Sequence, residues 1–342
     1  MEWNILGHEW AAKLLATHIA RGETRHAYLF TGPPGVGRRS LALRFAQALN
    51  CVNPPEPGLP CGACRPCLQI EKMQQADLSV IQAVDEDGVP REGGSLKIDQ
   101  IRDLQRGLSL SPYESKLRIA LLLRFEEANA NAQNAFLKTL EEPPEKAILL
   151  VTASASENLL PTISSRCEVL RLRPLPVAEL ETALQSRWNL EPDEARRLAH
   201  ISGGRPGYAL RLHHSPAELE RRQEWLDDLQ RLLGQNRRQR FNYVDQEFKE
   251  SKDNREKLRQ ALPVWLSYWR DVLLTVCGSA APLTNLDQAE GITRLAQRLD
   301  PTLVRQRVSD LEQAVGKLDA NVNTRLLAEV LLLDWPKISS PN

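Results

Sequence analysis

The sequence predicts a parallel α/β domain that is followed by helical domains. In the first half of the chain, short apolar runs alternate with amphipathic stretches, a pattern typical of βαβ units and of a parallel sheet covered by helices. A glycine-rich turn follows the first apolar run and precedes a helical pattern. After Pro174 the strand-like runs stop, and almost all of the remaining sequence has helical periodicity.

Five strands are expected in the α/β domain, at residues 27–31, 78–83, 118–123, 147–152 and 168–172. Between them, helices are expected near residues 8–20, 38–49, 98–107 and 130–141. The segment 85–95 holds three glycines, one proline and four acidic residues, which predicts an exposed loop.

Three domains are expected, because 342 residues exceed the usual size of one core. The α/β domain would span residues 1–173. Helices expected at 176–188 and 192–202, with a break at the glycine-rich segment 203–207, predict a small helical domain over residues 174–212. Residues 213–342 would form a larger helical domain. Its apolar residues recur on one helical face at Leu258, Leu262, Trp265, Leu266, Trp269 and Leu273.

Charge and composition exclude some classes of protein. Lys plus Arg and Asp plus Glu number 44 each, so the net charge does not indicate a free-standing DNA-binding protein, and any contact with nucleic acid must be local or shared. The basic segment 237–240 is expected to form a polar turn between helices rather than a DNA contact. No apolar run approaches the roughly 18–20 residues that span a bilayer, and no leader pattern opens the sequence. We expect a soluble, cytoplasmic protein without a membrane contact.

The turn GPPGVGRRS, residues 32–40, stands where a phosphate-binding loop belongs, between a strand and a helix. Its glycines Gly32, Gly35 and Gly37 match the spacing of that loop. The chemical positions differ, because Arg38 replaces the phosphate-binding Lys and Arg39 replaces the Ser or Thr that holds Mg²⁺. A guanidinium is bulkier than an ammonium group, and a cation at the metal-ligand position repels the metal. We therefore predict a loop that is kept for its shape, with ATP either not bound or not hydrolysed.

The acidic pair that would follow the third strand in an ATPase is displaced. Leu123 leads into Arg124 and Phe125, and the acids Glu126 and Glu127 come only afterwards. An exposed acidic helix start, favoured by the helix dipole, is the preferred interpretation. A shift of register that lets the two glutamates hold Mg²⁺ is the alternative.

Four cysteines, Cys51, Cys61, Cys64 and Cys67, occupy 17 residues with two Cys-x-x-Cys steps. This spacing predicts a closed tetrahedral zinc site within a module at residues 51–67, and such a site is structural because it has no open coordination position. An unliganded, reactive cysteine loop is the alternative.

Several segments resemble the bacterial clamp-loader subunits, gamma/tau and delta-prime. The motif NAFLKTLEEPP at residues 134–144 is similar to the family signature, and SSRC at 164–167 is similar to its Ser-Arg-Cys motif. The cysteine module and the segments 98–102 and 321–333 also fit. Active members keep the loop Lys and Thr, so Arg38 and Arg39 favour the delta-prime type.

The resemblance implies an AAA+ type module up to residue 173, a helical lid and a helical collar that joins a ring of five subunits. It implies that Arg166 is an arginine finger, a cation that acts in trans on the ATP site of a neighbouring gamma/tau subunit. The expected partners are gamma/tau, delta, the β sliding clamp and primed DNA. Two other functions remain open at this point: an active clamp-loader-type ATPase, and a zinc scaffold without a finger.

Overall fold

The computed structural model describes residues 3–85, 89, 93–248, 252–319 and 322–338. The chain divides into two compact units, one of Met1–Pro176 with Arg205–Tyr208 and one of Val177–Gly204 with Ala209–Asn342. The expected boundary between a small and a larger helical domain, near residue 212, stays a prediction. Among the described residues, no helix is both long enough and apolar enough to cross a membrane.

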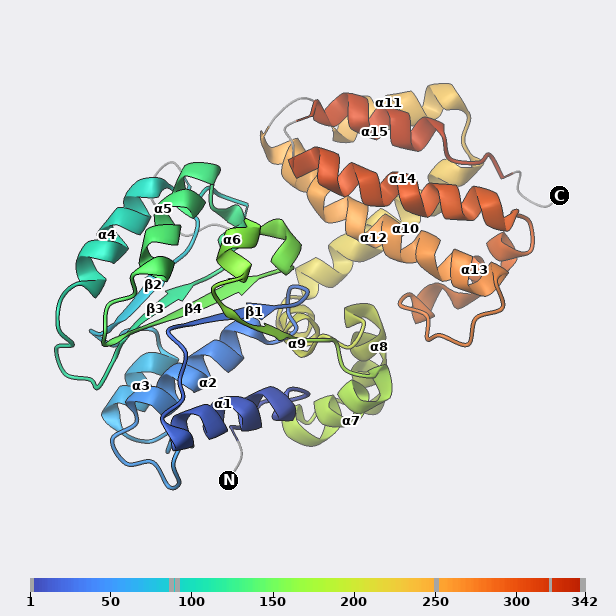
Figure 1. Cartoon of the computed structure of the whole chain (residues 1–342). Helices are drawn as coiled ribbons and strands as arrows, with labels where there is room; N and C mark the ends of the chain where they lie inside the picture. Colours follow the sequence, from blue (N-terminus) through green and yellow to red (C-terminus); the bar gives the residue numbers. More distant parts are fainter. Residues whose placement is uncertain (1–2, 86–88, 90–92, 249–251, 320–321, 339–342) are drawn as a thin grey trace. The chain divides into compact units, whose positions relative to one another are not determined.

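A five-stranded parallel sheet forms the centre of the first unit (Figure 1). Its strand order is β2-β3-β4-β1-β5, and every neighbouring pair is parallel. The strands are β1 (Ala27–Thr31), β2 (Leu78–Ile81), β3 (Arg118–Leu122), β4 (Ala147–Ala153) and β5 (Glu168–Arg171). All five predicted strands are confirmed, with shifts of one or two residues at some ends.

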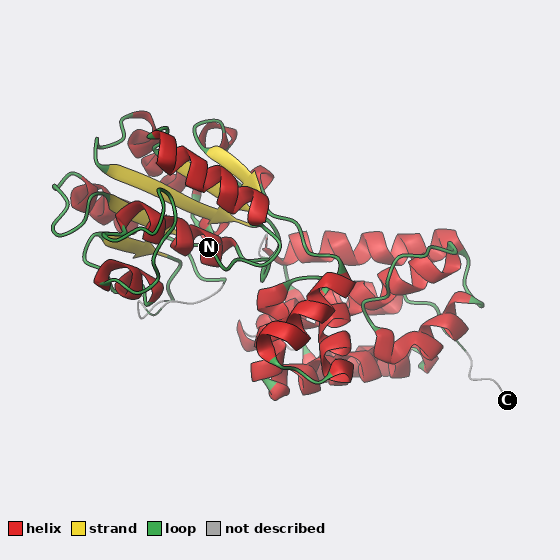
Figure 2. Ribbon diagram, turned by 90° about the horizontal axis from the view of Figure 1, so that it is seen from below, coloured by secondary structure: helices red, strands yellow, loops and turns green. Residues whose placement is uncertain are grey.

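Helices cover both faces of this sheet (Figures 1 and 2). Side chains alternate along β1, so that Tyr28 and Phe30 enter one apolar core and Ala27 and Leu29 enter the other. The first core includes side chains of α1 (Glu9–Arg21), α2 (Arg38–Asn50) and α3 (Arg65–Glu71). The second includes side chains of α4 (Ile98–Leu108), α5 (Ala130–Glu141) and α6 (Pro161–Ser164). Burial on both faces explains why β1 consists of five buried residues.

Parallel pairing brings the carboxyl ends of β1, β3 and β4 to one edge of the sheet. The turn at residues 32–37 follows β1, and the short 3₁₀ helix η1 (Phe125–Glu127) follows β3. Of the predicted loop 85–95, residues 86–88 and 90–92 lie outside the described residues. Its ends are joined by an antiparallel bridge between Val84 and Ser95.

The second unit consists of helices and loops in its described part (Figure 2). Val177–Trp188 (α7) and Pro192–Ser202 (α8) match the predicted pair, and Gly203 ends α8 with a left-handed φ of 58°. The helix α9 (Pro206–His214) starts inside the predicted break at 203–207. The remaining helices are α10 (Pro216–Gly234), α11 (Arg237–Glu247), α12 (Lys252–Val276), α13 (Ala289–Ala296), α14 (Pro301–Asp319) and α15 (Thr324–Leu333).

One apolar core joins helices α10 to α15. The predicted apolar face of α12 is confirmed: Leu258, Leu262, Trp265 and Trp269 are fully buried, and Leu266 and Leu273 pack against the same core while partly buried. The rings of Trp265 and Trp335 meet edge to face, with their centroids 5.2 Å apart. The C-terminal segment is thereby part of this core.

The predicted polar turn at 237–240 is wrong. These residues form the first turn of α11, and Arg240 is only 3% exposed. Its guanidinium donates hydrogen bonds to the carbonyl oxygens of Leu232, Leu332, Trp335 and Pro336, at 2.5–3.0 Å. The guanidinium can be buried because each carbonyl oxygen takes the place of a water molecule as its hydrogen-bond acceptor. Arg240 therefore fastens the C-terminal segment to α10 and α11.

We expect Arg240→Leu to lower the free energy of unfolding by about 3 kcal/mol, because it leaves buried carbonyl groups without a donor. Arg238→Leu is the matched control, since Arg238 is exposed in the same helical turn. Urea unfolding of both variants measures the difference. Equal stability of the two variants would contradict the role of Arg240.

Candidate functional site

The loop between β1 and α2 has the backbone shape of a phosphate cradle. Gly32, Gly35 and Gly37 adopt positive φ angles of 145°, 82° and 116°. A Cβ atom on Gly32 would lie 2.5 Å from the carbonyl oxygen of Leu172, which excludes any larger residue there. The loop also accepts a hydrogen bond, because the N–H of Gly207 donates to the carbonyl of Gly35 at 2.8 Å. The glycines are thus required by the fold, whether or not a phosphate binds.

Arg38 turns inward from this loop, whereas Arg39 is exposed. The Arg38 side chain is 9% exposed, and its Nη1 lies 3.8 Å from Oε1 of Glu126. The same carboxylate oxygen accepts the N–H of Ser154 at 3.0 Å. The cation at the phosphate-binding position therefore faces an anion of the chain itself.

The two glutamates after β3 do not form an exposed acidic helix start, so that interpretation is wrong. Their side chains are 20% and 14% exposed within η1. Burial raises the pKa of Glu127, although the N–H of Gly93 and the guanidinium of Arg124 act in the opposite direction. Arg124 adopts a left-handed φ of 49° and donates its N–H to Oγ1 of Thr152. The chain thus turns at Arg124 after the end of β3. The carboxylates of Glu126 and Glu127 then lie close to the guanidinium groups of Arg38 and Arg124.

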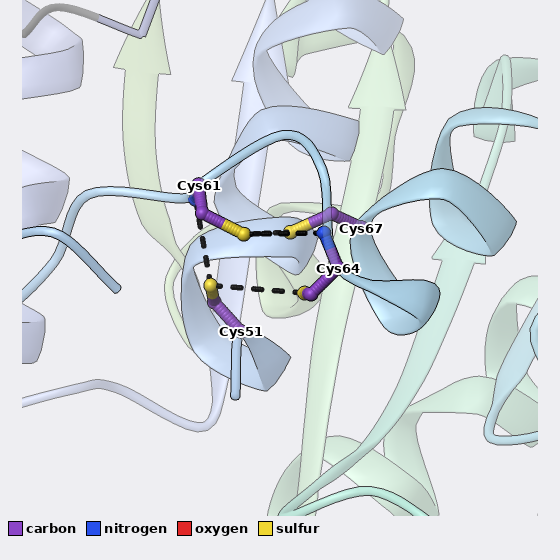
Figure 3. Close-up of side chains that lie close together, drawn as sticks. All are labelled: Cys51, Cys61, Cys64 and Cys67. Atoms are coloured by element: carbon purple, nitrogen blue, oxygen red, sulfur yellow. Dashed lines mark hydrogen bonds between the residues drawn. The ribbon is translucent and has the colours of Figure 1, made fainter. Parts of the chain in front are cut away.

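The four clustered cysteines converge on one point (Figure 3). All four Sγ atoms lie within 4.8 Å of one another, with Cys51 and Cys64 at 3.9 Å and Cys61 and Cys67 at 4.0 Å. Zn–S bonds of about 2.3 Å in a tetrahedron place sulfurs roughly 3.8 Å apart. Without a metal, backbone N–H groups of Ala63 and Cys64 lower the pKa of Cys61, whereas burial raises the pKa of Cys51 and Cys67, so it is the convergence of the four sulfurs that indicates a metal site. This donor set is consistent with a structural zinc site.

The cysteine module is fastened to the α/β domain through α2. Gln47 on that helix donates from Nε2 to the carbonyl of Cys67 and to the carboxylate of Glu71, both at 2.8 Å. The Nε1 of Trp3 donates to the carbonyl of Gly58 at 3.0 Å. Cys67 and Glu71 lie on α3, a helix of seven residues that the sequence reasoning missed because it is too short to show a period.

Arg166 lies between α6 and β5, where its side chain is 36% exposed. Nη1 donates to the carbonyl of Thr162 at 3.0 Å, and Nη2 donates to Oε1 of Glu141 at 2.8 Å. The next residue, Cys167, packs partly buried against the second core, and burial raises the pKa of its thiol to about 12. The Ser-Arg-Cys segment thus presents its arginine to the surface and its cysteine to the core.

The register of β5 separates Arg166 from the phosphate loop of the same chain. Glu168 pairs with Tyr28, so Arg166 precedes the amino end of β5, whereas the loop follows the carboxyl end of β1. By this register Arg166 is level with residue 26, six residues before Gly32. At about 3.3 Å per strand residue, this offset corresponds to roughly 20 Å along the sheet. The structure therefore joins Arg38 with Glu126 at one edge of the sheet and Arg166 with Glu141 towards the other.

The fold defines the class of protein: a parallel α/β domain with a phosphate-loop-like turn and a four-cysteine insert, followed by a helical C-terminal region. A family model described as DNA polymerase III, delta subunit, matches residues 7–176, and one described as DNA polymerase III, delta subunit, C terminal, matches residues 216–337. The chain belongs to the delta-prime subunits of DNA polymerase III, a clamp-loader family related to gamma/tau.

Two delta' subunits are similar to nearly the whole chain. The chain is 30% identical to the DNA polymerase III subunit delta' of Pseudomonas aeruginosa, with 98% of each chain covered. It is 29% identical to the subunit delta' of Bacillus subtilis, with 94% of each covered. The DNA polymerase III subunit tau of Escherichia coli is 33% identical over 55% of this chain and 28% of tau. Similarity to tau thus involves part of the chain, whereas similarity to the two delta' chains involves nearly all of it.

We expect about one zinc ion per purified chain, because four converging thiolates form a closed site. Cys64→Ser should lower the zinc content and the Tm of the protein, since the module then loses the ion that crosslinks it. Cys277→Ser is the control, because Cys277 is an exposed cysteine in the turn that follows α12, outside the cluster. Metal analysis and thermal unfolding measure both effects, and a zinc content far below one per chain would contradict the site.

Proposed function

We propose that this chain is a non-hydrolysing subunit of the clamp loader, which supplies Arg166 in trans to the ATP site of a gamma/tau neighbour. The observation that carries the proposal is the opposed placement of two arginines. Arg38 is buried at the chain's own phosphate loop, whereas Arg166 is partly exposed towards the other edge of the sheet.

The first half of the proposal concerns the chain's own loop. The ion pair of Arg38 and Glu126 occupies the position at which a phosphate and its Mg²⁺ would meet the protein. A nucleotide would have to displace Glu126 from Arg38, and Arg39 would still repel the metal. The nearby carboxylate of Glu127 is engaged by Arg124 and Gly93. These contacts support a loop that does not hydrolyse ATP.

The second half concerns the arginine finger. Arg166 is too far along the sheet from residues 32–38 to serve them, so any phosphate that it contacts belongs to another subunit. A cation in that position offsets the charge on the transferred phosphoryl group and can contribute about a thousandfold or more to turnover. The neighbouring Cys167 packs partly buried against the core, which anchors the segment beside Arg166.

The family relation supports the proposed partners. We propose that the chain joins gamma/tau and delta subunits in a ring of five in the cytoplasm. The assembly opens the β sliding clamp and places it on primed DNA. In this proposal the chain is not an enzyme by itself, and it acts as part of the DNA polymerase III holoenzyme. Zinc is its structural cofactor, held by Cys51, Cys61, Cys64 and Cys67.

The isolated chain should show no ATP turnover above background. The variant Arg38→Lys with Arg39→Thr should bind a fluorescent ADP analogue at least about tenfold more tightly, because it removes the repulsive cation at position 39 and restores the ammonium and hydroxyl groups of an active phosphate loop. It should still not hydrolyse ATP, since Arg124 follows β3 where an acid is needed. ATP turnover by the unmodified chain that disappears in Arg38→Ala would instead establish an autonomous ATPase.

Arg166→Ala should leave the complex assembled but lower its ATP-coupled clamp loading by about tenfold or more. Loading of labelled clamp onto primed DNA measures the effect, and size-exclusion chromatography tests assembly. Arg171→Ala is a control, because Arg171 is an exposed arginine at the end of β5, the strand that follows Arg166. Unchanged loading by Arg166→Ala would contradict the arginine-finger role and would favour a zinc-containing scaffold without a finger.

A further inference from the structure

We propose that Glu141 is a positioning residue that holds the guanidinium of Arg166 in the orientation in which it meets the neighbouring ATP site. This inference rests on the proposed function of Arg166. The two side chains come from separate motifs, and the fold joins Nη2 of Arg166 to Oε1 of Glu141 at 2.8 Å. Glu141 would act through Arg166 and would not itself contact ATP.

The backbone beneath Arg166 is already fixed by other contacts. Gln133 on α5 is 9% exposed, accepts the N–H of Leu160 at 3.0 Å and donates to the carbonyl of Ala128 at 3.1 Å. Ile163 of α6 is fully buried in the core beneath the sheet. These contacts leave the long side chain of Arg166 as the part that still has to be ordered.

Two acceptors order that side chain and leave donors available. The carbonyl of Thr162 accepts from Nη1, and the carboxylate of Glu141 accepts from Nη2. A guanidinium carries five N–H donors in one plane, so an anion can bind while both contacts persist. The 36% exposure of the Arg166 side chain provides access for that anion.

Stability does not explain the ion pair. Both partners are exposed, at 36% and 53%, and exposed ion pairs contribute little to folding because water and salt screen them. Glu141 is also the last residue of α5, where the helix dipole disfavours a carboxylate. The arginine offsets this repulsion. What the pair supplies is orientation, since it restricts the rotamers of a side chain that must reach across a subunit boundary.

The test uses the complex reconstituted with gamma/tau and delta subunits, and measures ATP turnover with β clamp and primed DNA. Glu141→Ala should lower kcat about threefold to tenfold, with KM for ATP changed less than about twofold, because misorientation affects the transition state more than binding. Glu141→Gln should retain more of the activity, since its amide oxygen still accepts from Nη2. The Tm of each variant should stay close to that of the unmodified chain.

Two controls separate positioning from a general effect. Glu142→Ala removes an equal charge at the same helix end, and no ion pair in the described part of the chain joins Glu142 to Arg166, so turnover should not change. In a complex that already carries Arg166→Ala, adding Glu141→Ala should cause no further loss, because the two residues act as one unit.

Each remaining outcome overturns the inference. A further loss in the Arg166→Ala background, or an equal loss in Glu142→Ala, would assign Glu141 a structural or general electrostatic role. Faster turnover in Glu141→Ala would mean that the carboxylate competes with phosphate for Arg166. If Arg166→Ala impairs turnover and Glu141→Ala does not, this inference alone fails. If Arg166→Ala has no effect, the proposed function fails with it.

Discussion

The parallel pairing of β1 with β4 and β5 is the constraint on which the rest of the first unit depends. It places the turn at residues 32–37 beyond the carboxyl end of β1 and Arg166 before the amino end of β5. If β5 ran antiparallel to β1, Arg166 and the turn at residues 32–37 of one chain would lie at the same edge of the sheet. Because the pairing is parallel, the two chemical features of the domain face different surroundings, and this separation supports action in trans.

Arginines at these two edges meet different electrostatic conditions. Arg38 is buried and lies 3.8 Å from Glu126, where attraction of about 4 kcal/mol at an effective dielectric near 20 opposes the cost of removing both charges from water. Arg166 and Glu141 are exposed, so their attraction is screened and contributes little to stability. The first pair is therefore shielded from water, whereas the second is accessible to solvent. The cysteine module has a third kind of support, because its short α3 depends on α2 and on the converging thiolates.

The strands and most helices were predictable because their apolar residues repeat with a clear period. The run at 27–31 is buried on both faces, and the stripe on α12 points inward as its spacing predicts. Features with no period were not predictable. Arg240 is a basic residue in a basic segment, and its burial depends on carbonyl groups of Leu232 and of residues 332–336 that the fold brings to it. The sequence likewise shows Glu126 only as an acidic residue after a strand, and its pairing with Arg38 follows from the fold.

By itself, the sequence determined the parallel α/β class, the helical C-terminal region, the loss of the loop Lys and hydroxyl, and the four-thiolate cluster, since all of these depend on residue type at short spacing. Tertiary structure alone decided which polar groups meet. Residues 38 and 126, 141 and 166, and 240 and 335 are far apart along the chain, and no local pattern couples them. Their partners follow from strand register and helix packing, which the whole chain determines together.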